Sequence, residues 1–144
     1  MIVQKVKTIS LESGEVILCN KGFVLVRLNG DREIDLEEVK KQVEAGVKLT
    51  NGDDYVAMFD AGGTIDVNEE GMTYAANYKN NNWKAFAIVV RSISERILAN
   101  YFIRFKKPVR PTKVFTNPER AIEWLSEHLK FEKPKDELLY QLEK

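Results

Sequence analysis

The chain has 144 residues, of which 44% are hydrophobic, and its 22 basic and 22 acidic side chains give a net charge of zero. This length and composition fit one domain that can bury a core without disulfides or metals. A zero net charge gives no overall field that would attract nucleic acid, and no apolar run is long enough to span a bilayer. Residues 1–5 lack a signal-peptide pattern, and the single Cys19 lies within an apolar run, so we expect a reduced thiol and a cytoplasmic protein.

The first third of the chain predicts an antiparallel meander. Residues 2–9 alternate loosely between polar and apolar, which indicates a half-exposed strand at or near a sheet edge. Two apolar runs, 15–19 and 23–28, flank Asn20-Lys21-Gly22, a sequence that favours a tight hairpin turn. An alternating edge strand at residues 2–9 can also pair with a second copy of itself, which predicts a homodimer.

The rest of the chain alternates helices with strands that are apolar at almost every position. The segments 55–59 and 83–90 must be buried on both faces, which calls for a sheet covered by helices. Asp35 caps a helix over 36–48, and Pro118 follows the capping residue Asn117 of a later one. Further elements are predicted as a helix at about 67–79 whose cap is either Asp66 or Asn68, a helix over 92–105, a strand at 113–115 and a short helix at 135–143.

This order of elements predicts a single α/β domain. Right-handed crossovers and short connections make the later strands parallel, so the meander continues into a mixed, partly parallel sheet with four to five helices. We expect the domain to cover residues 1–130. Residues 131–144 are expected to be a C-terminal helical extension of the same domain.

The helix over 92–105 supplies a candidate ligand site. Ser92 and Glu95 form a capping box, and a wide apolar face follows at helical spacing. We predict that Ile97, Tyr101 and Phe105 face the sheet, where they would hold a small apolar or lipid-like ligand.

A basic stretch overlaps this helix. Residues 91–113 carry seven basic side chains and one acidic side chain. Their cluster in a proline-bounded loop predicts an exposed basic surface that could meet an acidic protein, an anionic lipid surface or, as the weakest candidate, nucleic acid. That surface consists of Arg104, Lys106, Lys107 and Arg110.

The loop that follows the strand 55–59 is a candidate interaction site. It leaves the carboxyl end of a buried strand, where ligands and partners usually bind in open α/β sheets. It contains no phosphate-binding glycine pattern, and a plain strand-to-helix turn also explains its glycines. The candidate residues are Asp60, Gly62, Gly63, Thr64 and Asp66.

The sequence offers no catalytic or metal-binding constellation. His128 is the only histidine and lies on a predicted helix, whereas Cys19 lies in a strand at the other end of the chain. One histidine and one cysteine do not make a zinc site without several carboxylates. We therefore expect no enzyme activity and no cofactor.

Three stretches resemble a known family. Residues 91–102, the strand 111–115 and the helix 118–125, which ends in Ala-x-x-Trp-Leu, look like small bacterial STAS-like or SpoIIAA-like proteins. The resemblance covers about residues 1–130 and implies their α/β fold. It also implies relatives among anti-sigma-factor antagonists and a fold similar to CRAL-TRIO lipid carriers. Many members of the family have no known function.

One position departs from the antagonists of this family. In those proteins a phosphorylated serine stands two residues after the aspartate that ends a central strand, but here Gly62 follows Asp60 at that distance. This departure argues against a phosphorylation switch. We expect a non-catalytic bacterial regulatory or protein-interaction module, and the alternative is a carrier or sensor of a small apolar or lipid-like ligand.

Overall fold

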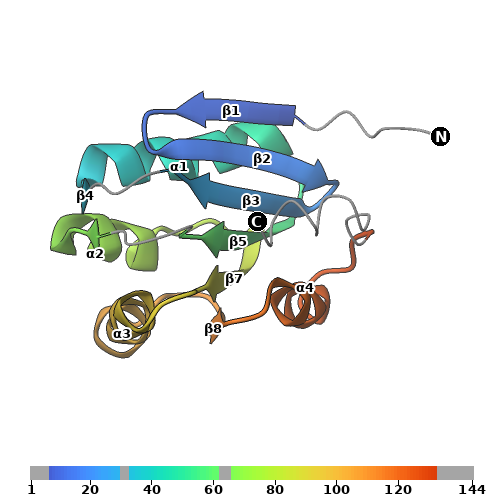
Figure 1. Cartoon of the computed structure of the whole chain (residues 1–144). Helices are drawn as coiled ribbons and strands as arrows, with labels where there is room; N and C mark the ends of the chain where they lie inside the picture. Colours follow the sequence, from blue (N-terminus) through green and yellow to red (C-terminus); the bar gives the residue numbers. More distant parts are fainter. Residues whose placement is uncertain (1–6, 30–32, 62–65, 133–144) are drawn as a thin grey trace.

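The computed structural model describes residues 7–29, 33–61 and 66–132. Its main element is a six-stranded sheet, antiparallel over its first three strands and parallel over the remaining pairs (Figure 1). This topology confirms the predicted α/β class, with a meander that continues into a partly parallel sheet. In spatial order the strands are β1 (Lys7–Leu11), β2 (Gly14–Asn20), β3 (Phe23–Leu28), β5 (Tyr55–Asp60), β7 (Trp83–Val89) and β8 (Thr112–Phe115).

Helices cover both faces of this sheet. Three of them connect successive parallel strands, and because right-handed crossovers in one direction along a sheet stay on one side, they share a face. The last helix packs on β5, β7 and β8 from the opposite face (Figure 1). The shared face carries α1 (Leu36–Thr50), α2 (Glu69–Asn77) and α3 (Ile93–Tyr101) with its π-helical continuation η1 (Phe102–Lys106), and the opposite face carries α4 (Pro118–Ser126).

The structure also contains a second, very small sheet that the sequence patterns do not predict. β4 (Glu33–Ile34) pairs in parallel with β6 (Asp66–Val67). Two-residue strands have no alternation long enough to detect in a sequence. The predicted helix 135–143 and residues 2–6 of the predicted edge strand lie outside the described residues, so the homodimer through residues 2–9 stays a prediction.

The capping residues begin the helices as their sequences predict. Asp35 accepts a hydrogen bond from the Glu38 amide at 2.9 Å, and Ser92 and Asn117 accept equivalent bonds at their helices. Asn68 accepts from the Gly71 amide at 2.9 Å, so it is the cap of α2 and Asp66 is not.

The sheet face under α4 is a filled core. Large apolar side chains of β3, β5 and β7 pack there against Ile122 and Leu125 of α4. Phe23 stacks on Phe131 with 5.0 Å between ring centroids. Cys19 is buried in the same cluster, and burial raises the pKa of its thiol to about 12.

Arg110 is buried, contrary to its predicted place on an exposed basic surface. Its guanidinium lies 3.7 Å from the Trp83 ring centroid and donates to the carbonyl oxygens of Ala75, Tyr78 and Trp83. Two of these carbonyls, those of Ala75 and Tyr78, lie at the C-terminal end of α2. The last backbone carbonyls of a helix have no hydrogen-bond donor within the helix, and Arg110 supplies one. Burial lowers the pKa of Arg110 to about 10, so the side chain is still a cation at neutral pH.

We predict that Arg110→Met destabilises the protein by roughly 2–4 kcal/mol, because buried carbonyls lose a charged donor. Arg110→Lys should recover only part of this loss, since one ammonium lacks the planar fork that reaches several carbonyls. Urea unfolding measures both variants. Arg104→Met, at an exposed position, is the control and should stay within about 0.5 kcal/mol of the parent. Equal stability of Arg110→Met and the control would contradict this role.

We also predict that Cys19 does not react in the folded protein. At pH 8 a thiol with a pKa near 12 forms almost no thiolate, so a disulfide reagent such as DTNB should modify it only as fast as the protein unfolds. A control chain with Cys19→Ala and an exposed Ser10→Cys should react at once. Rapid stoichiometric reaction of native Cys19 would show that this core opens more easily than described.

Candidate functional site

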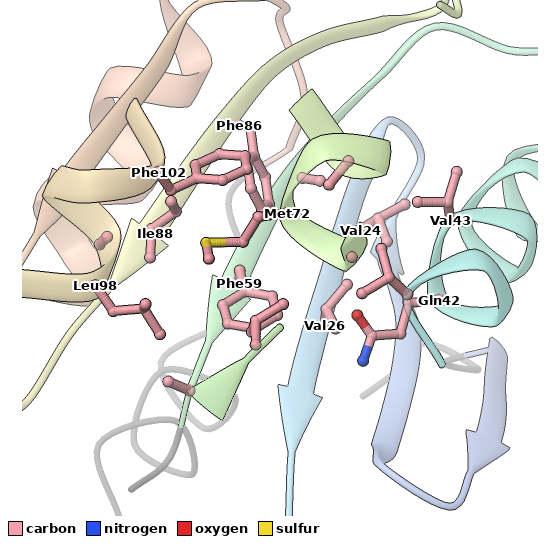
Figure 2. Close-up of a pocket in the computed structure, with 18 of the residues that line it drawn as sticks. Val24, Val26, Gln42, Val43, Phe59, Met72, Phe86, Ile88, Leu98 and Phe102 are labelled. Carbon is pink, nitrogen blue, oxygen red and sulfur yellow. The ribbon is translucent and has the colours of Figure 1, made fainter. Parts of the chain in front are cut away.

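A cavity of about 120 Å³ lies between the sheet and α1, α2 and α3 (Figure 2). Its floor consists of alternate residues on three parallel strands, because every second side chain of a strand points to the same face. Met72 of α2 lies among Phe59, Phe86 and Ile88 of this floor (Figure 2). The floor residues are Val24 and Val26 of β3, Ala57 and Phe59 of β5, and Phe86 and Ile88 of β7.

Small residues on the covering helices help to leave this space. Gly46 of α1, Ala75 of α2 and Ala99 of α3 all line the cavity. A Cβ atom added at Gly46 would meet only Val24 Cγ1, at 4.0 Å. At Gly71 the same addition would lie 2.8 Å from Val39 Cγ2, so this glycine is needed where α1 and α2 approach closely.

The chemistry of the cavity wall is almost wholly apolar. Among the described residues that line it, only the side chains of Gln42 and Glu95 carry an amide or a charge. The Gln42 Nε2 atom donates to Ser13 Oγ at 3.1 Å, and the Ser13 hydroxyl donates to Glu38 Oε2 at 3.3 Å. Burial raises the pKa of Tyr55, a further lining residue, to about 12, so its phenol stays neutral. Such a wall favours an apolar molecule over proton-transfer chemistry.

The predicted ligand-side residues of α3 do not face this cavity. Ile97 is 64% exposed and Phe105 is 62% exposed, and the Tyr101 hydroxyl donates to Glu69 Oε1 at 2.8 Å. These residues were predicted to face the sheet because they form the most apolar stripe of the helix. In the structure, the neighbouring stripe, shifted by one residue along the sequence, faces the sheet instead. That stripe consists of Glu95, Leu98, Ala99 and Phe102.

The candidate interaction loop is described only at its two ends. Asp60 is buried at the end of β5. Its carboxylate forms an ion pair of 2.9 Å with Arg91, a residue that lies just after the end of β7. Asp66 is exposed in β6. The three central candidates, Gly62, Gly63 and Thr64, lie outside the described residues.

The predicted basic surface is reduced to two exposed cations, Arg104 and Lys107. Arg110 is buried, and Lys106 forms an ion pair of 2.5 Å with Glu69 on α2. The hydrogen bond from Lys106, and then that from Tyr101, lowers the pKa of the Glu69 carboxyl. These contacts join η1 to α2 at the surface.

Other candidate sites are not assembled in the parts of the chain described here. In residues 7–29, 33–61 and 66–132 no three histidine, cysteine or acidic side chains come together as a metal site. Over the same ranges, no helix combines the length and hydropathy needed to traverse a bilayer. The exposed His128 packs edge-on against Trp124, with 4.6 Å between ring centroids.

The sequence predicted a ligand site between the helix 92–105 and the sheet but not the residues that line it, although two signals of the cavity are visible in the sequence. Gly46 and Ala99 stand at inward helical positions where larger apolar residues usually fill a core. Met72 and Ala75 of α2 also line the cavity.

Comparison with known proteins places the chain in a family. No curated protein matches it. A similar solved structure is the crystal structure of an uncharacterised protein of the DUF3478 family from Shewanella loihica PV-4, described as having a SpoIIAA-like fold. The two share 12% identity with a TM-score of 0.47, over 87% of this chain and 98% of that one. The family model described as "Domain of unknown function (DUF7793)" matches residues 17–129, so this chain belongs to that family.

Proposed function

We propose that this domain is a non-catalytic module that binds a small apolar molecule between its sheet and α1, α2 and α3, as a carrier or sensor. The observation that carries the proposal is the apolar cavity of about 120 Å³. Atoms that line an empty space lose their packing contacts, and water gains few hydrogen bonds there. An apolar ligand restores the contacts, so its binding stabilises the folded chain.

The size of the cavity suggests the size of the ligand. An engineered apolar cavity of about 150 Å³ in another protein stays dry and binds benzene. The present cavity is of the same order, so it suits a molecule of one or two small rings, or a short branched hydrocarbon. A long acyl chain would need the helices to move apart.

The polar groups nearest the cavity support binding over catalysis. Of the lining side chains, Gln42 already donates its amide to Ser13. A general acid or base needs a titratable group that reaches substrate with a partner to exchange protons. Among the described lining residues the titratable groups are Glu95 and Tyr55, and the raised pKa of Tyr55 keeps its phenol neutral.

Indene is a suitable apolar probe, because it consists of two fused rings without a hydrogen-bonding atom. We predict saturable binding, with methyl NMR shifts at Met72 and Ile88 and a higher melting temperature. At ten times the dissociation constant the stabilisation should be about 1.4 kcal/mol. Shifts confined to exposed residues, or no saturable binding, would contradict the proposal.

Filling the cavity provides the matched variant. Ala57→Leu adds a side chain from the sheet floor, and Gly46→Leu adds one from α1. Either should weaken indene binding at least tenfold, whereas Asn77→Leu, at an exposed position of α2, should leave it unchanged. Unchanged binding in the filled variants would place the ligand elsewhere.

A second candidate function, protein association, rests on an exposed apolar stripe of α3 and η1. Ile93 is 79% exposed and continues the line of Ile97 and Phe105. Exposed cations, Arg96 and Arg104, flank this stripe. Two copies packed through it would bring like charges together, so the charges favour an acidic protein surface with an apolar centre.

A designed amphipathic helical peptide tests this second candidate. A peptide with a leucine stripe flanked by glutamates should bind more tightly than one flanked by lysines, and added salt should reduce the difference. Ile93→Asn with Ile97→Asn should abolish binding as measured by fluorescence anisotropy. Equal binding of both peptides would contradict the acidic partner, and so would a dimer in light scattering that the same variant dissociates.

A further inference from the structure

Glu95 stands out in the cavity wall because its carboxyl group is buried and only half used. The residue is 4% exposed and lines the cavity from the first turn of α3. Its Oε1 atom accepts a hydrogen bond of 2.7 Å from the Arg91 backbone amide. Its Oε2 atom is buried and has no hydrogen-bond partner among the described residues.

Helix capping explains one of these oxygens but not the other. Ser92 caps α3 by accepting from the Glu95 amide at 3.1 Å, and the Glu95 side chain reaches back to the chain that enters the helix. This reciprocal contact needs a single oxygen. At most helix starts the second oxygen faces water, which satisfies it, whereas here the side chain turns into an apolar wall.

The surrounding residues that the structure describes do not supply the missing donor. The Arg91 guanidinium is bound to Asp60, and the Gln42 amide donates to Ser13. The other lining groups near α3 include Val90, Leu98 and Phe102, which have no polar side-chain atoms. A carboxylate oxygen left in such a place is costly unless something donates to it.

We infer that the natural ligand is a compact apolar body that carries one hydrogen-bond donor, a hydroxyl or an N–H group, and that Glu95 Oε2 accepts this hydrogen bond. The inference rests on the proposed function and adds to it the polar contact that selects the ligand. The apolar body fills the space over β3, β5 and β7, and the donor lies at the α3 end of the cavity. A hydrocarbon of the same shape lacks the donor and leaves the oxygen unpaired.

A comparison of indole with indene tests the hydrogen bond to Glu95 separately from the proposed apolar binding. The two molecules share one ring frame, but indole has an N–H donor and no competing acceptor, whereas indene has neither. Calorimetric titration of the full chain should show indole binding about tenfold tighter, as expected for one added hydrogen bond in an apolar site. The wild-type comparison needs no variant, so it does not depend on any change in folding.

Glu95→Gln is the matched variant. Its amide oxygen can keep the bond from the Arg91 amide, and its NH₂ group then takes the place of Oε2 and cannot accept from indole. We expect the indole-to-indene preference to fall to about one, with indene binding retained. Circular dichroism melting confirms that the variant is folded, and a crystal of the wild-type complex should place the indole nitrogen 2.7–3.2 Å from Glu95 Oε2.

Each alternative result has a defined meaning. Equal affinity of the wild-type protein for indole and indene would overturn the role of Glu95 and leave the apolar site standing. An indole preference that survives in Glu95→Gln would also overturn it. Failure of both molecules to bind in the cavity would overturn the proposed function and this inference together.

Discussion

The structure depends on one topological constraint, the placement of three successive crossover helices on the same face of the sheet. Strands β3, β5, β7 and β8 run parallel and are hydrogen-bonded in that order, so α1, α2 and α3 must lie side by side over them. The opposite face receives α4, which packs on β5, β7 and β8. The strands therefore bury side chains on both faces, which explains their nearly continuous apolar sequences.

The two faces of the sheet differ in how completely side chains fill the space under their helices. Under α4, large side chains such as Phe23, Met58 and Leu125 are completely or almost completely buried and close the core. Under the other three helices, small residues such as Gly46 and Ala99 leave about 120 Å³ unfilled. A protein selected for stability alone would gain by filling this space, since cavities cost packing energy. The cavity therefore agrees with the proposed ligand binding, and the Glu95 oxygen that has no partner among the described residues agrees with it as well.

The sequence carried enough information for the architecture but not for the site. Caps, the hairpin and two-faced strands are local patterns, and each leaves a signature over a few residues. The direction in which α3 faces is not local: a stripe through Ile97 is more apolar than the one through Glu95 and Leu98, yet the second meets the sheet. Arg110 was misplaced for a similar reason, because only the tertiary fold brings α2 carbonyls and the Trp83 ring around it. A cavity depends on the positions of many side chains at once, and the tertiary fold sets these positions.

Xenon tests the central claim most directly, because this gas occupies dry apolar cavities without needing a specific contact. Diffraction from crystals of the whole chain under xenon pressure should show a strong site bounded by Ala57, Met72 and Phe86, with the surrounding backbone unchanged. If these side chains were instead in mutual contact and xenon stayed absent from this face of the sheet, the space would not exist, and the account of an apolar binding domain would be wrong.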